Sequence, residues 1–240
     1  MKIKLMSFNI QHARNYNFPN EDRIDIRLMA DVISAQGGDI VGLNEVRGKG
    51  EHPEYTDQAK EIAEILGYNY FFAPALSFPG LGLYGNAIVT RFPIISAEVI
   101  PIPDPPDKTA GNGFETRCIL KAVIDTGTPL TVFVSHFGLN PSEAENAASA
   151  AVKALADVPS PKVLMGDFNL IPDSPVLDRI RILMADTADM LGRQKLSFPS
   201  DNPTRKIDYI FVSDDIKVIE ADIPEIIASD HRPHTALIEL

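Results

Sequence analysis

One short segment of this sequence carries more information than any other: VLMGDFN, at residues 163–169. Its first three residues are apolar and indicate a buried strand, which ends where Asp167 is followed two positions later by Asn169. Side chains at positions i and i+2 of an extended chain point to the same face, so we expect these two to project together. Gly166 would let other groups approach the backbone. A carboxylate beside an amide suits a phosphate, a hard cation or an activated water.

Polar side chains stand at the ends of other strand-like runs in the same way. Asn9 closes Lys2–Ile10, Glu45 follows Asp39–Asn44, His136 follows Leu130–Ser135, Asp208 precedes Tyr209–Ser213, and Asp230 and His231 precede Thr235–Leu240. Taken singly, an Asn or Asp at a strand end is usually a turn former, and a lone His is usually a surface or core group. Several carboxylates at one sheet edge repel one another, however, and require a cation or a histidinium among them.

The order of the elements predicts an α/β sandwich. Further strand-like runs are Tyr68–Ala73, Asn86–Thr90, Ile119–Ile124 and Lys162–Met165, and helix-like segments are Ile24–Ala35, Gln58–Leu66, Ala144–Ala156 after an Asn140 cap, and a helix opening at Ser174. Alternation of early strands and helices favours parallel pairing, whereas the two strands around Gly127 favour antiparallel pairing. We therefore expect mixed, mostly antiparallel sheets with helices outside, in one domain over residues 1–240. The Pro101–Pro106 and Lys108–Gly113 segments are expected to form a surface loop beside the site.

Composition narrows the function classes. The 240 residues are 45% hydrophobic and carry a net charge of −11, which gives no long-range attraction to a polyanion such as duplex DNA. The lone Cys118 stands in an apolar stretch and is expected to be a small core residue. The first residues lack a signal-peptide pattern, and no run reaches the ~18 apolar residues of a membrane span. We predict a monomeric cytoplasmic protein without a membrane span.

Taken together, several motifs resemble those of the endonuclease/exonuclease/phosphatase superfamily, which includes DNase I and neutral sphingomyelinases. They are Ser7-Phe8-Asn9-Ile10, Leu43-Asn44-Glu45-Val46, Tyr84-Gly85-Asn86-Ala87-Ile88, Ser135-His136-Phe137-Gly138, Gly166-Asp167-Phe168-Asn169, Ile207-Asp208-Tyr209-Ile210 and Ser229-Asp230-His231-Arg232-Pro233. Each motif is weakly specific, but the ordered set spans nearly the whole chain. The resemblance implies a four-layer, DNase I-like α/β sandwich and metal-dependent hydrolysis of phosphate esters.

The resemblance also implies a metal site and contacts to the substrate. Glu45 matches the principal metal ligand of the family, and Asn9 and Asp230 match residues close to the same ion. An oxygen-only set of this kind fits Mg²⁺, or Mn²⁺ in its place. Asn86 and Arg117 are further candidates for contacts to the substrate phosphate.

The remaining motif residues match the catalytic groups of the family. Asp208 corresponds to the acid that orients the final histidine, here His231, so that this histidine acts as a base or has a fixed tautomer. Asp167 and Asn169 correspond to the pair that orients the attacking water. His136 corresponds to the histidine that stabilises the transition state or assists the leaving group. The implied mechanism is in-line attack of water without a covalent intermediate.

The chain departs from the family pattern at two positions. Asn44 stands where Gln usually precedes the metal-binding Glu, and Gln11 stands where some nucleases carry an extra acid. These departures, the scattered basic residues and the absence of tryptophan favour a small or lipid-derived phosphodiester, or a phosphomonoester, over nucleic acid. A nuclease acting on DNA or RNA is the alternative, and a non-catalytic phosphate-binding module is an alternative of another class. The full set of motif residues favours catalysis.

Overall fold

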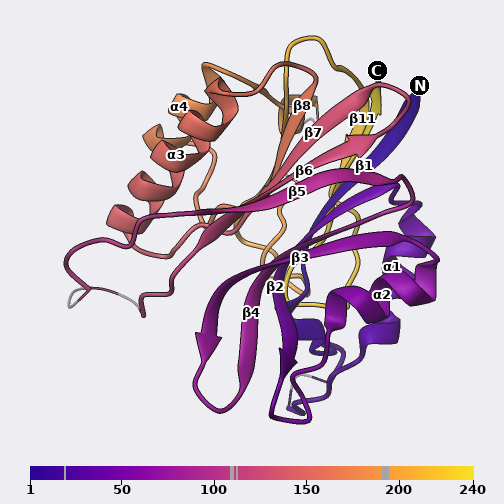
Figure 1. The fold of residues 1–240 in the computed structure, drawn as a ribbon, viewed down its shortest axis with the longest axis vertical. Helices are drawn as coiled ribbons and strands as arrows, with labels where there is room; N and C mark the ends of the chain where they lie inside the picture. Colours follow the sequence, from indigo (N-terminus) through magenta and orange to yellow (C-terminus); the bar gives the residue numbers. More distant parts are fainter. Residues whose placement is uncertain (19, 109–110, 112, 191–194) are drawn as a thin grey trace.

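Two six-stranded β-sheets pack face to face, and pairs of helices cover their outer faces (Figure 1). This computed structural model describes residues 1–18, 20–108, 111, 113–190 and 195–240. A core of aliphatic side chains fills the space between the sheets, and two further cores lie beneath the helices. The order of layers is therefore helix, sheet, sheet, helix, and the expected α/β sandwich is confirmed.

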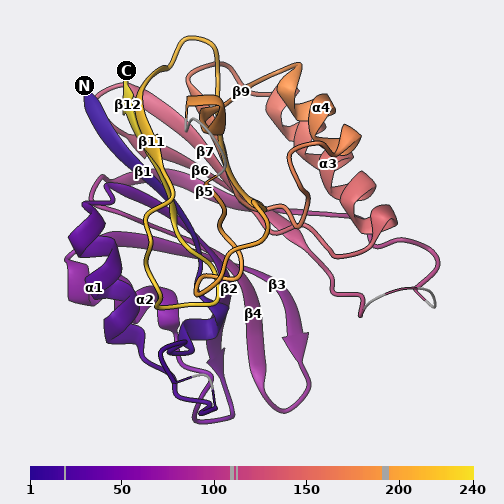
Figure 2. The same ribbon diagram turned by 180° about the vertical axis from the view of Figure 1, so that it is seen from behind.

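The first sheet has the strand order β11-β12-β1-β2-β4-β3. Its strands are β1 (Lys2–Asn9), β2 (Ile40–Gly50), β3 (Asn69–Phe78), β4 (Gly82–Thr90), β11 (Lys217–Asp222) and β12 (His234–Glu239), and the helices on its outer face are α1 (Ile26–Gln36) and α2 (Gln58–Leu66). Only β1 and β2 pair in parallel. Figure 2 shows β1 beside β12 with both chain termini at one end, where Met1 and Leu240 exchange hydrogen bonds.

The second sheet has the strand order β5-β6-β7-β8-β10-β9. Its strands are β5 (Ile94–Pro101), β6 (Cys118–Asp125), β7 (Pro129–Ser135), β8 (Lys162–Asp167), β9 (Ala185–Asp186) and β10 (Asp208–Val212), and its helices are α3 (Pro141–Ala156) and α4 (Pro175–Arg181). Short 3-10 turns cover Gln11–Ala13 and Thr187–Met190. Here β7 and β8 form the parallel pair, whereas β6 and β7 are antiparallel around Gly127, as expected.

Helix caps and strand register place the functional segments. The carboxylates of Asp25 and Asp57 accept hydrogen bonds from backbone N–H groups in the first turns of α1 and α2, and the predicted α3 start is confirmed by Glu143, which accepts the Asn140 N–H. Asn9 pairs in register with Asn44, and Asp208 with Asp167. The ends of β1, β8 and β10 and the middle of β2 therefore bring their polar residues to the same region of the two sheets.

Three strands were not predicted from the sequence. They are β5, β9 and β11, each at or near a sheet edge and each with a largely exposed or very short pattern. An edge strand buries little apolar surface, so its alternation is weak. Cys118 is buried, as expected. Of the predicted loop, residues 102–106, 108, 111 and 113 lie outside any helix or strand, whereas Pro101 is the last residue of β5. Residues 109, 110 and 112 of this prediction lie outside the described ones.

None of the helices in the described part of the chain has the length and the apolar run that crossing a membrane requires.

Candidate active site

Asp167, the last residue of β8, lies at the centre of the predicted site. Its Oδ2 atom lies 3.1 Å from Nδ2 of Asn9, 3.5 Å from Nε2 of His136 and 3.6 Å from Nε2 of His231. These partners are far apart in the chain and are all buried. The structure thus brings four of the predicted residues together around one carboxylate oxygen.

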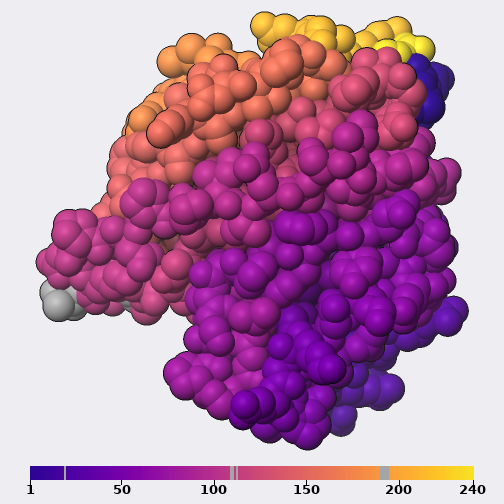
Figure 3. Space-filling model, in the orientation of Figure 1, coloured from indigo at the N-terminus to yellow at the C-terminus, as the bar shows by residue number. Residues whose placement is uncertain are grey.

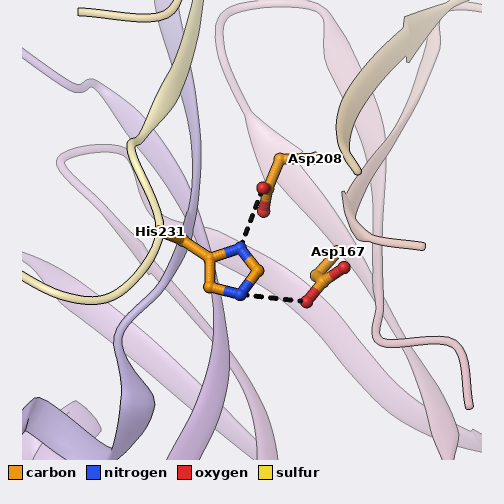
Figure 4. Close-up of side chains that lie close together, drawn as sticks. All are labelled: Asp167, Asp208 and His231. Atoms are coloured by element: carbon orange, nitrogen blue, oxygen red, sulfur yellow. Dashed lines mark hydrogen bonds and ion pairs between the residues drawn. The ribbon is translucent and has the colours of Figure 1, made fainter. Parts of the chain in front are cut away.

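His231 and Asp208 form a buried dyad beside Asp167 (Figure 4). Nδ1 of His231 lies 2.9 Å from Oδ2 of Asp208. Burial lowers the pKa of His231, but Asp208 and Asp167 outweigh burial and raise this pKa to about 10. For the carboxyl group of Asp167, burial raises the pKa to about 7, although the charge of His231 opposes this shift. At neutral pH His231 is therefore an imidazolium, with its Nε2–H directed toward Asp167.

His136, unlike His231, is uncharged. Its Nδ1 lies 3.0 Å from an Nη1 atom of Arg117, and a guanidinium can only donate hydrogen bonds, so Nδ1 is the acceptor. Burial, reinforced by the charge of Arg117, holds the pKa of His136 well below its usual range. The imidazole is therefore neutral and carries its proton on Nε2, which faces Asp167. Nδ2 of Asn169 lies 3.1 Å from Nε2, but both atoms are donors, so they form no hydrogen bond with each other. One histidine of the site is a cation and the other is a neutral donor.

Asn169 reaches the site by a route that the sequence did not predict. The strand ends at Asp167, and Asn169 adopts a left-handed conformation with φ of 53° instead of an extended one. The cause is local: Oδ1 of Asp167 accepts the Asn169 N–H at 2.9 Å and turns the chain. The Asn169 amide then donates to the Phe137 carbonyl at 3.0 Å, which fixes it beside His136.

Glu45 and Asp230 form the exposed side of the cluster. Oε1 of Glu45 accepts from Asn9 at 2.9 Å, and Oε2 accepts from the Tyr84 hydroxyl at 2.8 Å. Asp230 accepts from Nε2 of Gln11 at 2.9 Å. Burial and the charge of Glu45 raise the pKa of Asp230, opposed by His231. Both carboxylates are half-buried and line the same cavity, and each of their oxygens keeps a further lone pair.

This donor set suits a divalent cation with oxygen ligands. A cation near Glu45 and Asp230 would relieve the repulsion that raises the pKa of Asp230, and Oε1 of Gln11 is buried there without a hydrogen-bond partner among the described residues. Asp167, Asp208 and His231 also each offer a ligand atom within 4.8 Å of the others. In that group, however, Nδ1 of His231 and Oδ2 of Asp208 already form a hydrogen bond with each other, so this group suits a metal less well than Glu45 and Asp230 do.

Asn86 and Arg117, the predicted phosphate contacts, are placed differently. Arg117 lines the cavity between His136 and Glu115, with Nη2 2.8 Å from a Glu115 oxygen. Asn86 is buried below the cavity, where its amide donates to the Cys118 carbonyl at 2.9 Å and accepts from the side chain of Asn44 at 2.8 Å. Asn86 therefore joins the two sheets beneath the site.

The cluster opens into a cavity of about 570 Å³, which we call the site cavity. Its walls are Glu45, Phe78, Tyr84, Gly113, Phe114, Glu115, Arg117, His136, Leu139, Asp167, Asn169, Phe198, Arg205, Ile207, Asp230 and His231. In Figure 3 the surface is hollowed between the protruding segment after β5 and the β3–β4 hairpin. The segment 113–115 lies in the wall, as predicted for the loop beside the site.

Sequence reasoning missed three contributors to the site. Tyr84 holds Glu45, Gln11 holds Asp230, and the Phe198 ring packs 4.7 Å from the ring of His231. Tyr84 lies two positions before Asn86 on β4, so the alternation of this strand could have placed both on the inner face. No local pattern marks Phe198.

Comparisons with known proteins agree with this geometry. A sequence model of the Endonuclease/Exonuclease/phosphatase family matches residues 6–231. Among solved structures, "Bacteroides thetaiotaomicron VPI-5482 mannosyl-6-phosphatase Bt3783" is 20% identical with a TM-score of 0.79, covering 99% of this chain and 100% of the other. An endonuclease/exonuclease/phosphatase from Beutenbergia cavernae DSM 12333 is 24% identical with a TM-score of 0.73, covering 100% of this chain and 72% of the other.

D. rerio TDP2, solved with a single-strand DNA product, is 15% identical with a TM-score of 0.73, covering 100% of this chain and 99% of the other. At these identities the structural matches establish the fold alone. No curated protein sequence matches the chain. The family match over nearly the whole sequence leads to one conclusion: the chain belongs to the endonuclease/exonuclease/phosphatase family and is a metal-dependent hydrolase of phosphate esters.

Proposed function

We propose that this enzyme is a phosphodiesterase acting on a small or lipid-derived substrate. The observation that supports this most directly is the pair of buried histidines around Asp167, one a cation and one neutral, in a cavity edged by Glu45 and Asp230. A phosphate ester needs hydrogen-bond donors for its phosphoryl oxygens and an acceptor for the proton of the attacking water. This cluster supplies both, and we propose that the enzyme works as a monomer in the cytoplasm.

Glu45 and Asp230, with Asn9, are proposed to hold Mg²⁺ or Mn²⁺. When bound, the cation supplies positive charge that neutralises developing negative charge on the phosphoryl and leaving oxygens. Tyr84 keeps Glu45 in place by donating to Oε2 at 2.8 Å. The Asn9 amide bridges Glu45 and Asp167, so it ties the proposed metal ligands to the catalytic carboxylate.

The protein groups divide the chemistry by protonation state. Asp167, whose pKa is raised to about 7, accepts the proton of a water that Asn169 helps to orient. The neutral His136 keeps its Nε2 proton and donates a hydrogen bond from Nε2–H to a phosphoryl oxygen. The His231 imidazolium, held by Asp208, adds positive charge on the same side. The water attacks phosphorus directly, and the bond to the leaving oxygen breaks.

The walls of the site cavity favour a small substrate. Phe78, Phe114, Leu139 and Phe198 give it an apolar rim, which suits the carbon skeleton of a leaving group. The net charge of −11 opposes binding of a long polyanion. A nuclease is the second candidate, because a protein of the same fold, D. rerio TDP2, was solved with a single-strand DNA product.

Hydrolysis of bis-p-nitrophenyl phosphate and p-nitrophenyl phosphate, each with Mg²⁺, Mn²⁺ or EDTA, tests the proposal. We expect metal-dependent release from the diester, which Asp167→Asn abolishes and Asp173→Asn, at an exposed acid outside the walls of the site cavity, leaves unchanged. Preference for the monoester would instead identify a phosphatase. Faster cleavage of single-stranded oligonucleotides than of small diesters would favour the nuclease.

A further inference from the structure

Arg205 differs from every other arginine in the described part of the chain. Each of the others has a carboxylate oxygen within 4.0 Å, as expected in a chain of net charge −11. Among the described residues, no carboxylate pairs with Arg205, although this residue lines the site cavity. Arg205 is exposed, so its guanidinium, which no acid neutralises, is available to an anionic ligand beside the phosphate-ester site.

The position of Arg205 is fixed relative to the catalytic histidine. Its guanidinium lies 5.0 Å from the centre of the Phe198 ring, and the same ring packs 4.7 Å from His231. The backbones of Phe198 and Arg205 exchange two hydrogen bonds of 3.0 Å. A cation stacked on an aromatic ring loses little freedom when it binds an anion, because the ring already holds it.

A second cavity, of about 310 Å³, lies on the other side of Arg205 and shares it with the site cavity. We call it the side cavity. Its charged wall residues are Arg181, Asp186, Asp189, Lys195, Arg205 and Lys206, four cations against two acids. The two cavities are therefore neighbours. Two of the four cations pair with acids outside the wall, Arg181 with Asp178 and Lys195 with Asp222, which leaves Arg205 and Lys206 as the cations available to a ligand.

Lys206 is the second unusual cation of this wall. Its side chain is only 7% exposed, and Nζ has no hydrogen-bond partner among the described residues. The nearest carboxylate oxygen, Oδ2 of Asp186, is 3.6 Å away, and Nζ lies 3.4 Å from the centre of the Tyr209 ring. A buried ammonium retains donors that water or a ligand has to satisfy.

We propose that the side cavity binds a second phosphate group of the substrate, through Arg205 and Lys206, while the first phosphate is hydrolysed in the site cavity. This inference rests on the proposed function and narrows the substrate class to small molecules with two phosphate groups. A small molecule is favoured over a nucleic-acid strand because, of the described arginines, only Arg205 is free of an acid partner, so no continuous cationic track continues beyond it.

The side cavity can be tested separately from catalysis. Binding of inorganic phosphate is measured on the metal-free protein in EDTA, and His136→Ala, which removes a donor of the site cavity and none of the side cavity, should leave this binding unchanged. We expect calorimetry to show a single weak site, with affinity at least tenfold lower in Arg205→Gln and in Lys206→Met. The control is Arg91→Gln, because Arg91 also stacks on a ring, that of Tyr68, but pairs with Asp39.

Absence of phosphate binding in EDTA, or binding that survives both substitutions, would overturn the inference. Because Lys206→Met removes a buried charge and could unfold the protein, Arg205→Gln at the exposed ring stack carries the test by itself if circular dichroism shows that Lys206→Met is misfolded.

Kinetics then distinguish this inference from the proposed function. With Mg²⁺, we expect Arg205→Gln to raise KM for fructose 1,6-bisphosphate at least tenfold more than KM for fructose 6-phosphate, with kcat little changed. An equal effect on both substrates would contradict a second-phosphate site. If neither fructose phosphate is hydrolysed while small diesters are, KM of wild type and Arg205→Gln is compared for an oligonucleotide and for a diester that carries a second phosphate. If Arg205→Gln does not raise KM more for the diester with the second phosphate, the inference is overturned.

Discussion

At the scale of single residues, burial and neighbouring charges give the two histidines of the candidate site different protonation states. His136 and His231 both approach Asp167 Oδ2, at 3.5 and 3.6 Å, yet one has a lowered and the other a raised pKa. The difference comes from their partners on the far side: the Arg117 guanidinium for His136 and the Asp208 carboxylate for His231. The same side chain thus serves as a neutral donor and as a cation.

Replacing either histidine tests these roles. A transition-state donor or charged partner contributes about 10²–10⁴ to the rate, so His136→Ala and His231→Ala should each lower kcat at least about 100-fold. The change in kcat is measured with the best diester, and circular dichroism checks the fold. His52→Ala, at an exposed histidine, serves as the control and should have no effect. Near-native turnover by either site variant would remove that histidine from the mechanism.

The buried His234 gives a prediction about stability and pH. Burial, with a contribution from Lys206, lowers its pKa from 6.5 to about 3. Between these values the unfolded chain binds a proton that the folded protein does not, so stability falls as the pH falls. In His234→Gln this group is removed. The free energy of unfolding should then fall less steeply between pH 6 and pH 4 than in the wild type, by about 1.4 kcal/mol per pH unit.

Urea unfolding of both proteins at several pH values measures this slope. The other histidines remain in both proteins, so the difference isolates His234. Parallel stability curves for the two proteins would show that His234 is not the source of the acid sensitivity.

At the scale of elements, the contact between β7 and β8 depends on Gly166. Its φ is +148°, and a Cβ atom there would lie 1.8 Å from the Ser135 carbonyl oxygen. Gly166→Ala must therefore separate two neighbouring strands and should lower the free energy of unfolding by at least about 3 kcal/mol. Urea denaturation measures the loss.

A matched control is Gly127→Ala in the β6–β7 turn. Gly127 also has a positive φ, +85°, but a Cβ atom there meets nothing within 4 Å. Gly127→Ala should therefore lower the free energy of unfolding only by the cost of the left-handed conformation, about 1–2 kcal/mol. Equal losses at the two glycines would mean that the steric contact at Gly166 is relieved without cost.

The sequence predicted elements best where several local signals agree. The helix over Gln58–Leu66 is confirmed at its predicted bounds, because an apolar stripe, an Asp cap and a terminal Gly agree there. The strand after Asp39 is longer than expected and continues to Gly50, because pairing with β4 resumes after Glu45 turns with a φ of 59°. Pairing partners decide such extensions, and they are not encoded locally.

For the site, sequence reasoning identified the acids, amides and histidines at strand ends, which lie together as expected. It could not show that Asn86 is buried beneath the site or that Phe198 links His231 to Arg205. Those facts depend on how two sheets pack against each other, and short-range patterns contain no record of it.

At the scale of the whole molecule, the site exists only where the two sheets meet. Asn44 of the first sheet donates to Asn86 and to the Ser135 carbonyl, and it accepts the Asp167 N–H at 2.9 Å. These buried hydrogen bonds join β2 to β7 and β8 directly below the carboxylate of Asp167. The Glu45 side of the site and the His136 side are therefore held in register by the packing of the sheets.

The metal dependence of phosphate-ester hydrolysis tests the central claim most directly. With bis-p-nitrophenyl phosphate, the wild-type protein should release p-nitrophenol in Mg²⁺ or Mn²⁺ and should release none in EDTA. The Glu45→Gln variant should need a much higher metal concentration to reach half of its maximal rate. The binding of Mn²⁺, followed by electron paramagnetic resonance, should weaken in parallel. Hydrolysis that persists in EDTA, or an unchanged Mn²⁺ affinity in Glu45→Gln, would contradict the account.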